Sequence, residues 1–279
     1  MWIEIGKFFL YAIFIVIVSK VILVKSLRKL AENLQLKSRV IGNIAGVATS
    51  IPELLTVTVS SFRGLIGTSL YNIISSNVIN FIQYSISLIV NKNYHLIRNK
   101  GILIQIFLVI LTIIFPIILL KVENVFHIMI VFILIVIYLI FYWISKKIHE
   151  KYLNYEEIKM EKVKKEEIGN HKNKQSYIYI GYILIAGILL YFIGDALGNV
   201  LENLAEHFRI AEWILGSLLG MITSIPELVT FFEAQKHYIK NKDEVLLGVI
   251  EATNNLLTSN MLNLFIIQAI GICIYIALS

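Results

Sequence analysis

The segment Thr-Ser-Ile-Pro-Glu-Leu occurs twice in this chain, at residues 49–54 and again, unchanged, at residues 223–228. Each copy lies inside a stretch that is apolar enough to cross a lipid bilayer. With a constant offset of 174, 12 of the 27 residues from 30 to 56 are identical in the second copy. Chance similarity between two apolar helices does not explain this agreement, so the chain contains an internal repeat. A carboxylate that is placed twice inside the membrane is typical of a protein that moves ions.

A second polar segment follows each copy. Residues 72–80 read Asn-Ile-Ile-Ser-Ser-Asn-Val-Ile-Asn, and residues 255–263 read Asn-Leu-Leu-Thr-Ser-Asn-Met-Leu-Asn. Here the offset is 183, so nine more residues separate the two parts of the second copy than of the first. Residues four apart share one face of a helix. Each segment therefore predicts a polar stripe, formed by Asn72, Ser76 and Asn80 in the first copy and by Asn255, Ser259 and Asn263 in the second.

The composition is that of a membrane protein, because 57% of the 279 residues are hydrophobic and only 16% are charged. A helix rises about 1.5 Å per residue, so roughly 20 apolar residues cross the hydrocarbon core. Runs of suitable length predict eight transmembrane helices, at residues 8–25, 40–62, 65–90, 101–120, 124–144, 177–198, 212–234 and 245–278. The last run is too long for one straight crossing. We expect it to be tilted, broken at its polar segment or continued along the membrane interface.

Basic residues alternate between the predicted loops, so the net charge of +6 does not indicate nucleic-acid binding. Twenty lysines and arginines fall in loops on one side of the predicted membrane, and four fall on the other side. Because cytoplasmic loops are enriched in these residues, we expect a plasma-membrane protein with both termini outside. The loop of residues 146–176, with nine lysines and six glutamates, is then cytoplasmic and is predicted to be a solvated linker without a core of its own.

The two repeats are predicted to be inverted relative to each other. Five predicted spans lie in residues 1–145 and three in residues 177–279, and an odd number of spans in the first half turns the second repeat over. The fold class that we expect is an all-α polytopic membrane protein. Its repeats, about residues 28–85 and 192–268, should meet near the membrane midplane, where inverted-repeat transporters form their binding sites.

Glu53 and Glu227 are the charges at the centre of the repeats. An ionised carboxylate in the middle of the bilayer costs about 2.5–3.5 kcal/mol by insertion scales, so the fold must compensate for it. The hydroxyl residues three and four positions before each glutamate share its helical face, and the intervening proline interrupts the helix and frees backbone carbonyls. We therefore expect two broken helices that line a polar cavity. The hydroxyl positions are Thr49, Ser50, Thr223 and Ser224.

The side chains offered by the repeats bind through oxygen. Carboxylate, hydroxyl, amide and backbone oxygens suit hard cations such as Ca²⁺ or Na⁺, whereas zinc and copper favour histidine or thiolate. The single cysteine, Cys273, provides neither a disulfide nor a thiolate site. Glu251, four residues before Asn255 on the same stripe, is expected to lie at the membrane interface, and the alternative is a ligand at the entrance of the site. A purely structural interpretation also stands, in which Ser, Thr and Asn hold the helices together, but that role does not require a duplicated charge.

These motifs resemble those of the sodium/calcium exchanger family, within the cation/Ca²⁺ antiporter superfamily. Each inverted repeat of that family carries a G-T-S-x-P-E-like helix followed by a G-S-N-x-x-N/D-like helix. The resemblance implies exchange of Ca²⁺ against Na⁺, with Glu53 and Glu227 as the principal cation ligands. It also implies that Thr49, Ser50, Thr223 and Ser224 line the same site, and that Ser76, Asn80, Ser259 and Asn263 complete it.

The sequence departs from the family pattern in three respects. Ser75 and Thr258 replace the usual glycine before Ser-Asn, so tighter helix packing is expected there. The final ligand positions are Asn80 and Asn263, where some relatives have an aspartate, so a third charge is missing. Prokaryotic relatives usually have ten spans, and this sequence predicts eight.

The leading hypothesis is a secondary active antiporter that exchanges Na⁺ and Ca²⁺ by alternating access. One alternative is exchange coupled to H⁺ or K⁺, since two glutamates in one cavity can titrate when desolvated. Another is a membrane subunit that uses its repeats for assembly and moves no ion. An enzyme is not expected, because the sequence offers no set of nucleophile and base, no metal-binding His motif and no nucleotide loop. No resident cofactor is expected, and the expected partners are inorganic cations and the lipid bilayer.

Overall fold

The computed structural model describes residues 2–33, 36–120, 128–153, 176–237 and 245–278. Within these residues, eight helices are long and apolar enough to cross a membrane, which confirms the predicted number. These are Trp2–Leu27, Ser38–Phe62, Ile66–Val90, Lys100–Ile117, Ile128–Tyr152, Tyr177–His207, Glu212–Lys236 and Val245–Leu278.

Several spans consist of more than one helical element. The first half of the chain contains α1 (Trp2–Val18), the π-helical turn η1 (Ser19–Val24), α2 (Lys25–Asn33), α3 (Ser38–Thr49), α4 (Ile51–Phe62), α5 (Ile66–Val90), the 3₁₀ turn η2 (Tyr94–Arg98), α6 (Lys100–Leu120) and α7 (Ile128–Tyr152). The second half contains α9 (Ser176–Glu202), the π-helical turn η4 (Asn203–His207), α10 (Glu212–Thr223), α11 (Ile225–His237), α12 (Val245–Met261), the π-helical turn η6 (Leu262–Ile267) and α13 (Gln268–Leu278).

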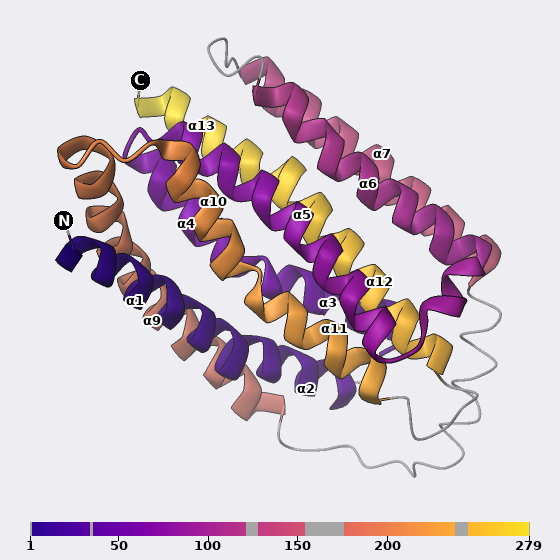
Figure 1. The fold of residues 1–279 in the computed structure, drawn as a ribbon. Helices are drawn as coiled ribbons and strands as arrows, with labels where there is room; N and C mark the ends of the chain where they lie inside the picture. Colours follow the sequence, from indigo (N-terminus) through magenta and orange to yellow (C-terminus); the bar gives the residue numbers. More distant parts are fainter. Residues whose placement is uncertain (1, 34–35, 121–127, 154–175, 238–244, 279) are drawn as a thin grey trace.

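The helices run side by side along one long direction (Figure 1). Helices α1 and α2 lie against α9 at one edge of the bundle, and α6 and α7 form the opposite edge. The remaining helices of the two repeats, α3, α4, α5, α10, α11 and α12, lie between these edges. Helix α1 begins and α13 ends at the same end of the bundle, as an even number of crossings requires. Large apolar side chains on the outer helices, such as Phe132 and Leu184, are exposed, which suits contact with hydrocarbon.

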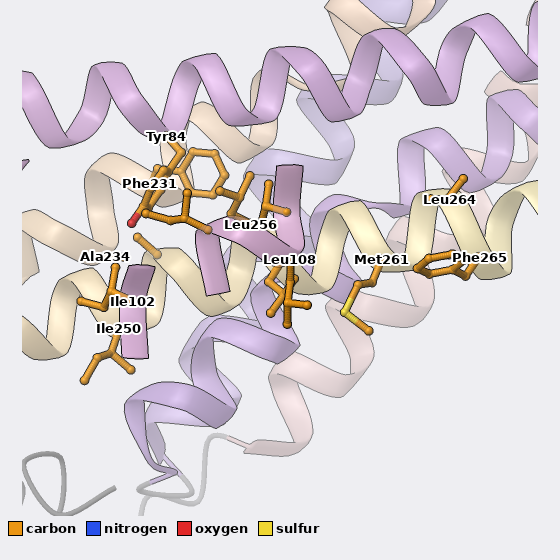
Figure 2. Close-up of a cluster of buried hydrophobic side chains, with 14 of the residues drawn as sticks. Tyr84, Ile102, Leu108, Phe231, Ala234, Ile250, Leu256, Met261, Leu264 and Phe265 are labelled. Atoms are coloured by element: carbon orange, nitrogen blue, oxygen red, sulfur yellow. The ribbon is translucent and has the colours of Figure 1, made fainter. Parts of the chain in front are cut away.

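Two hydrophobic clusters flank the repeats. One joins α5, α6, α7, α11 and α12, and in Figure 2 its Tyr84 and Phe231 pack together at one end while Phe265 lies at the other. The rings of Tyr84 and Phe231 meet edge to face, with 5.8 Å between their centroids, a favoured aromatic geometry. The second cluster joins α1, α9 and α10 around Phe8 and Leu215.

The two repeats interlock through glycine faces. On α3, a Cβ atom added at Gly46 would lie 2.7 Å from the backbone oxygen of Asn255 on α12. On α10, a Cβ atom added at Gly220 would lie 2.6 Å from the backbone oxygen of Asn72 on α5. Because these positions have no side chain, the first half of each broken helix packs against the second helix of the other repeat. Neither repeat buries its polar stripe alone.

The two broken helices are interrupted immediately before the glutamates, as predicted. Helix α3 gives way to α4 at Ser50, and α10 gives way to α11 at Ser224. Pro52 and Pro226 occupy the second position of the following helix, where a missing N–H costs little because the first turn has no intrahelical acceptor for it. The proline therefore begins a new helix.

The final span is one long helix that continues through a π-helical turn. The turn begins at Leu262, within the polar segment, so Asn263 lies inside it. Gly271 lies within helix α13, and a Cβ atom there would lie 2.9 Å from Ser61 Oγ and 3.0 Å from Ser69 Oγ. This glycine therefore serves close packing of α13 against α4 and α5.

The fifth span ends later than predicted, and Glu251 is more fully packed than its position near a span end suggests. Helix α7 continues to Tyr152, into the predicted linker, because a helix can extend beyond its apolar run on a charged face where Lys146 and Glu150 lie four residues apart. Most of the rest of the predicted linker, residues 154–175, lies outside the described residues. Glu251 is buried within the bundle, with 2% of its surface exposed, and its predicted position near the membrane interface stays a prediction. Its backbone is packed beneath the glycine face of α3.

Candidate cation site

Glu53 and Glu227 lie in the first turns of α4 and α11, directly after the breaks. Both side chains are fully buried, with 0% of their surface exposed. The two carboxylates are near enough to interact electrostatically across the repeats. The N-terminal end of a helix carries partial positive charge, which favours a carboxylate there. The break in each span thus places a helix N-terminus inside the bundle and a glutamate at that end.

The threonine before each break lies beside the carboxylate of the other repeat. The side chains of Thr223 and Ser76 lie beside Glu53, and that of Thr49 lies beside Glu227. Thr223 Oγ1 donates to the backbone oxygen of Leu219 at 2.9 Å. A hydroxyl that donates its hydrogen to the preceding turn keeps its lone pairs for another partner. Such hydroxyls are available as acceptors in the centre of the bundle.

The serines at the breaks show the same pattern. Ser50 Oγ donates to the backbone oxygen of Gly46 at 2.9 Å, and Ser224 Oγ donates to that of Gly220 at 2.7 Å. Both serines are buried. Their lone pairs therefore remain inside the bundle rather than facing lipid.

The second helix of each repeat adds serine and asparagine. Ser259 Oγ donates to Glu227 Oε1 at 3.1 Å and lies 3.0 Å from Ser50 Oγ. Asn80 Nδ2 donates to Ser259 Oγ at 3.4 Å. This chain of contacts joins both broken helices with α5 and α12. All ten residues that the sequence predicted are buried: Glu53, Glu227, Thr49, Ser50, Thr223, Ser224, Ser76, Asn80, Ser259 and Asn263. The contacts described here connect eight of them, whereas Ser224 lies at the break after α10 and Asn263 lies in η6.

Five oxygen atoms in this group are buried and receive no hydrogen bond from the described part of the chain. They are Glu53 Oε1, Glu53 Oε2, Glu227 Oε2, Asn80 Oδ1 and Asn263 Oδ1. A buried acceptor without a partner costs about 1–3 kcal/mol, and more when it is charged. All five atoms are of the type that hard cations bind. The described residues contain no cluster of three or more His, Cys, Asp or Glu side chains, so the arrangement offers two carboxylates supplemented by neutral oxygens.

Thr56 and Thr230 are supporting residues that the sequence did not nominate. Asn72 Nδ2 donates to Thr56 Oγ1 at 2.6 Å, and the equivalent Asn255 Nδ2 donates to Thr230 Oγ1 at 2.7 Å. Thr230 Oγ1 in turn donates to the backbone oxygen of Glu227 at 2.9 Å. Each pair ties the second helix of a repeat to the turn that carries its glutamate. Thr56 and Thr230 are identical residues at equivalent positions of the repeat, and this agreement could have identified them from the sequence.

A cavity of about 590 Å³ lies beside this region, bordered by Pro226 and Thr230. Its walls include four lysines and one carboxylate, that of Glu233. The excess positive charge opposes cation binding there, so this cavity is distinct from the group of buried oxygens.

The family model of the sodium/calcium exchanger protein matches residues 7–147 and 178–278. The chain belongs to this family. Membership makes this exchanger a cation/Ca²⁺ antiporter, as the resemblance implied. No curated protein sequence gives a significant match.

Solved structures of the sodium-calcium exchanger NCX_Mj share the fold of this exchanger. One, soaked with 2.5 mM Na⁺ and 0.1 mM Ca²⁺, is 23% identical with a TM-score of 0.52, and the match covers 98% of this chain and 82% of that chain. Another, soaked with 10 mM Na⁺ and zero Ca²⁺, is 21% identical with a TM-score of 0.53, covering 98% of this chain and 84% of that chain. At these identities the likeness shows the architecture.

Proposed function

We propose that this exchanger moves Ca²⁺ in one direction and Na⁺ in the other through a single site shared by its two repeats. Glu53 and Glu227 supply the charge, and the hydroxyl and amide oxygens around them complete the coordination. The observation that carries the proposal is the group of five buried oxygens without donors, contributed by both repeats. A dehydrated cation would satisfy these atoms together.

The charge of the site suits exchange. Two carboxylates balance one Ca²⁺ or two Na⁺ ions, so either load neutralises the buried charge. Ca²⁺ takes 6–8 oxygen ligands, and two carboxylates with Asn80, Asn263 and nearby hydroxyls can provide that number. An empty, doubly ionised site would leave two charges desolvated in the membrane, which is costly. This cost favours replacement of one load by the other over movement of the empty site.

The proposed placement is the plasma membrane, with both termini outside and residues 154–175 in the cytoplasm. The support for it is the charge asymmetry of the loops. Residues 1–145 and 177–279 are then the two transmembrane halves, each with one repeat. No resident cofactor takes part, because the cations are the substrates.

The deciding experiment measures ⁴⁵Ca²⁺ uptake into proteoliposomes under imposed gradients of Na⁺, K⁺ or H⁺. Uptake driven by an outward Na⁺ gradient supports the proposal, whereas uptake driven only by H⁺ or K⁺ would assign a different coupling ion. Glu53→Gln and Glu227→Gln should each abolish or severely weaken uptake, because the amide keeps the volume and removes the charge. The matched control is Glu150→Gln, an exposed carboxylate near the end of α7. Full uptake in either buried variant would refute the site.

A further inference from the structure

The helices α5 and α12 cross at a symmetric pair of asparagines. Asn77 Nδ2 donates to the backbone oxygen of Asn260 at 3.2 Å, and Asn260 Nδ2 donates to the backbone oxygen of Asn77 at 3.2 Å. The two residues are equivalent in the repeats, with the offset of 183. Their reciprocal bonds place the axis that relates the repeats between them. Both side chains are fully buried.

The remaining amide oxygens of this pair hold the two site asparagines. Asn80 Nδ2 donates to Asn260 Oδ1 at 3.2 Å, and Asn263 Nδ2 donates to Asn77 Oδ1 at 3.2 Å. Each site asparagine is therefore bound by the pair member from the other repeat. In both cases the amide nitrogen is engaged, while Oδ1 receives no donor from the described residues.

The two ends of an asparagine amide have nearly equal size and opposite polarity. Packing alone does not decide which end faces a cation, but a hydrogen bond does. With the nitrogen held by an acceptor behind it, the oxygen is the end left to face the centre of the site. In the reverse orientation, an NH₂ group would face the cation and repel it.

Resting on the proposed function, we propose that Asn77 and Asn260 are positioning residues that orient Asn80 and Asn263 with their amide oxygens toward the transported cation. Asn77 is itself fixed, because its second hydrogen is donated to the backbone oxygen of Thr112 on α6 at 3.3 Å. Both of its hydrogens are then in use, and its own oxygen must face Asn263. The pair touches no cation.

The same geometry limits the charge of the site. A residue at position 80 or 263 must donate a hydrogen bond, because the atom behind it is an acceptor. An ionised aspartate there would face the oxygen of Asn77 or Asn260 without a hydrogen to share. The pair thus favours amides at both positions and keeps the site at two carboxylates.

A double-mutant cycle on Ca²⁺ exchange tests the proposal. Asn77→Ala, Asn263→Ala and the double variant are compared for the KM of Ca²⁺ and for the rise in melting temperature that Ca²⁺ produces over each variant's own Ca²⁺-free value. We expect each single change to raise KM about tenfold, as the loss of one well-oriented ligand implies. When Asn263 is already alanine, Asn77→Ala should change the KM of Ca²⁺ by less than about twofold, because the side chain that Asn77 positions is already absent.

The crossed combination is the matched control. Asn80→Ala removes the amide that is hydrogen-bonded to Asn260 rather than to Asn77. The variant that combines Asn80→Ala with Asn77→Ala should therefore raise KM by the product of the two single effects. If Asn77→Ala raises KM by the same factor with and without the Asn263 side chain, the positioning role is overturned. If Asn77→Ala does not fold, the equivalent cycle of Asn260→Ala with Asn80→Ala decides by the same criterion.

The Glu53→Gln variant distinguishes a wrong positioning role from a wrong cation site. If Glu53→Gln abolishes exchange and both cycles are additive, only the positioning role is lost. If Glu53→Gln exchanges normally, the cation site itself is refuted.

Discussion

Replacing Gly220 with alanine tests whether the close approach of α10 and α5 shapes the cation site. The added Cβ atom would lie 2.6 Å from the backbone oxygen of Asn72 and 2.9 Å from the backbone nitrogen of Ser76. Real Cβ contacts essentially never fall below 3.0 Å, so the two helices must move apart by at least about 0.4 Å. Overpacking of this kind costs about 1–3 kcal/mol.

Alanine also has a higher helix propensity than glycine, by about 1 kcal/mol. A control variant with the same gain and no clash is therefore needed, so that the gain cancels in the comparison. Gly187 on α9 has no atom within 4 Å of its added Cβ. The Gly187→Ala variant therefore receives the propensity gain without the clash. The difference in unfolding free energy between the two variants isolates the packing cost, and we expect Gly220→Ala to be about 1–3 kcal/mol less stable than Gly187→Ala.

The assay is equilibrium unfolding in mixed detergent micelles, paired with ⁴⁵Ca²⁺ uptake. Separation of the helices would break the bond from Ser76 Oγ to the Gly220 oxygen, which is already 3.4 Å long, so the KM of Ca²⁺ should rise as well. Gly46→Ala should behave in the same way, because its added Cβ would lie 2.7 Å from the backbone oxygen of Asn255. Equal stability of Gly220→Ala and Gly187→Ala would refute the packing argument.

Three further outcomes are expected. Tyr84→Phe should lower the unfolding free energy by about 1 kcal/mol, measured in the same micelles, because it removes the 2.7 Å bond to Thr253; unchanged stability would show that this bond does not stabilise the fold. Asn263→Asp should change the pH profile or the ion competition of ⁴⁵Ca²⁺ uptake by placing a carboxylate against Asn77 Oδ1, whereas unchanged profiles in a folded variant would remove position 263 from the site. Cysteines placed in residues 154–175 should react only with reagents applied to the cytoplasmic side, and reaction from outside would reverse the proposed topology.

The number of spans was predictable, because the bilayer fixes the length of an apolar run. The repeat also predicted that Glu53 and Glu227 are buried, as they are, whereas their role in binding a cation stays a prediction. The end of α7 at Tyr152 was not predictable from hydropathy, since a charged face can continue a helix after the apolar run ends. The sequence did not show that Glu251, which lies near a span end, is buried against α3.

The roles of Asn77 and Asn260 required the structure. Both asparagines stand out in the repeat, but their reciprocal bonds depend on where α5 and α12 cross. A sequence pattern identifies which residues share a face of one helix. It does not say which atoms of two distant helices meet.

The interlocked packing of the repeats also has a consequence for biogenesis. The glycine face of α3 packs against α12, which is synthesised more than 190 residues later. Until then, the glycine face of α3 lacks the contacts that α12 provides, and Glu53 lacks its neighbour Thr223. A fragment of residues 1–153 or of residues 176–279 should therefore not accumulate in the membrane when it is made alone. Co-expression of the two fragments should restore the accumulation of both.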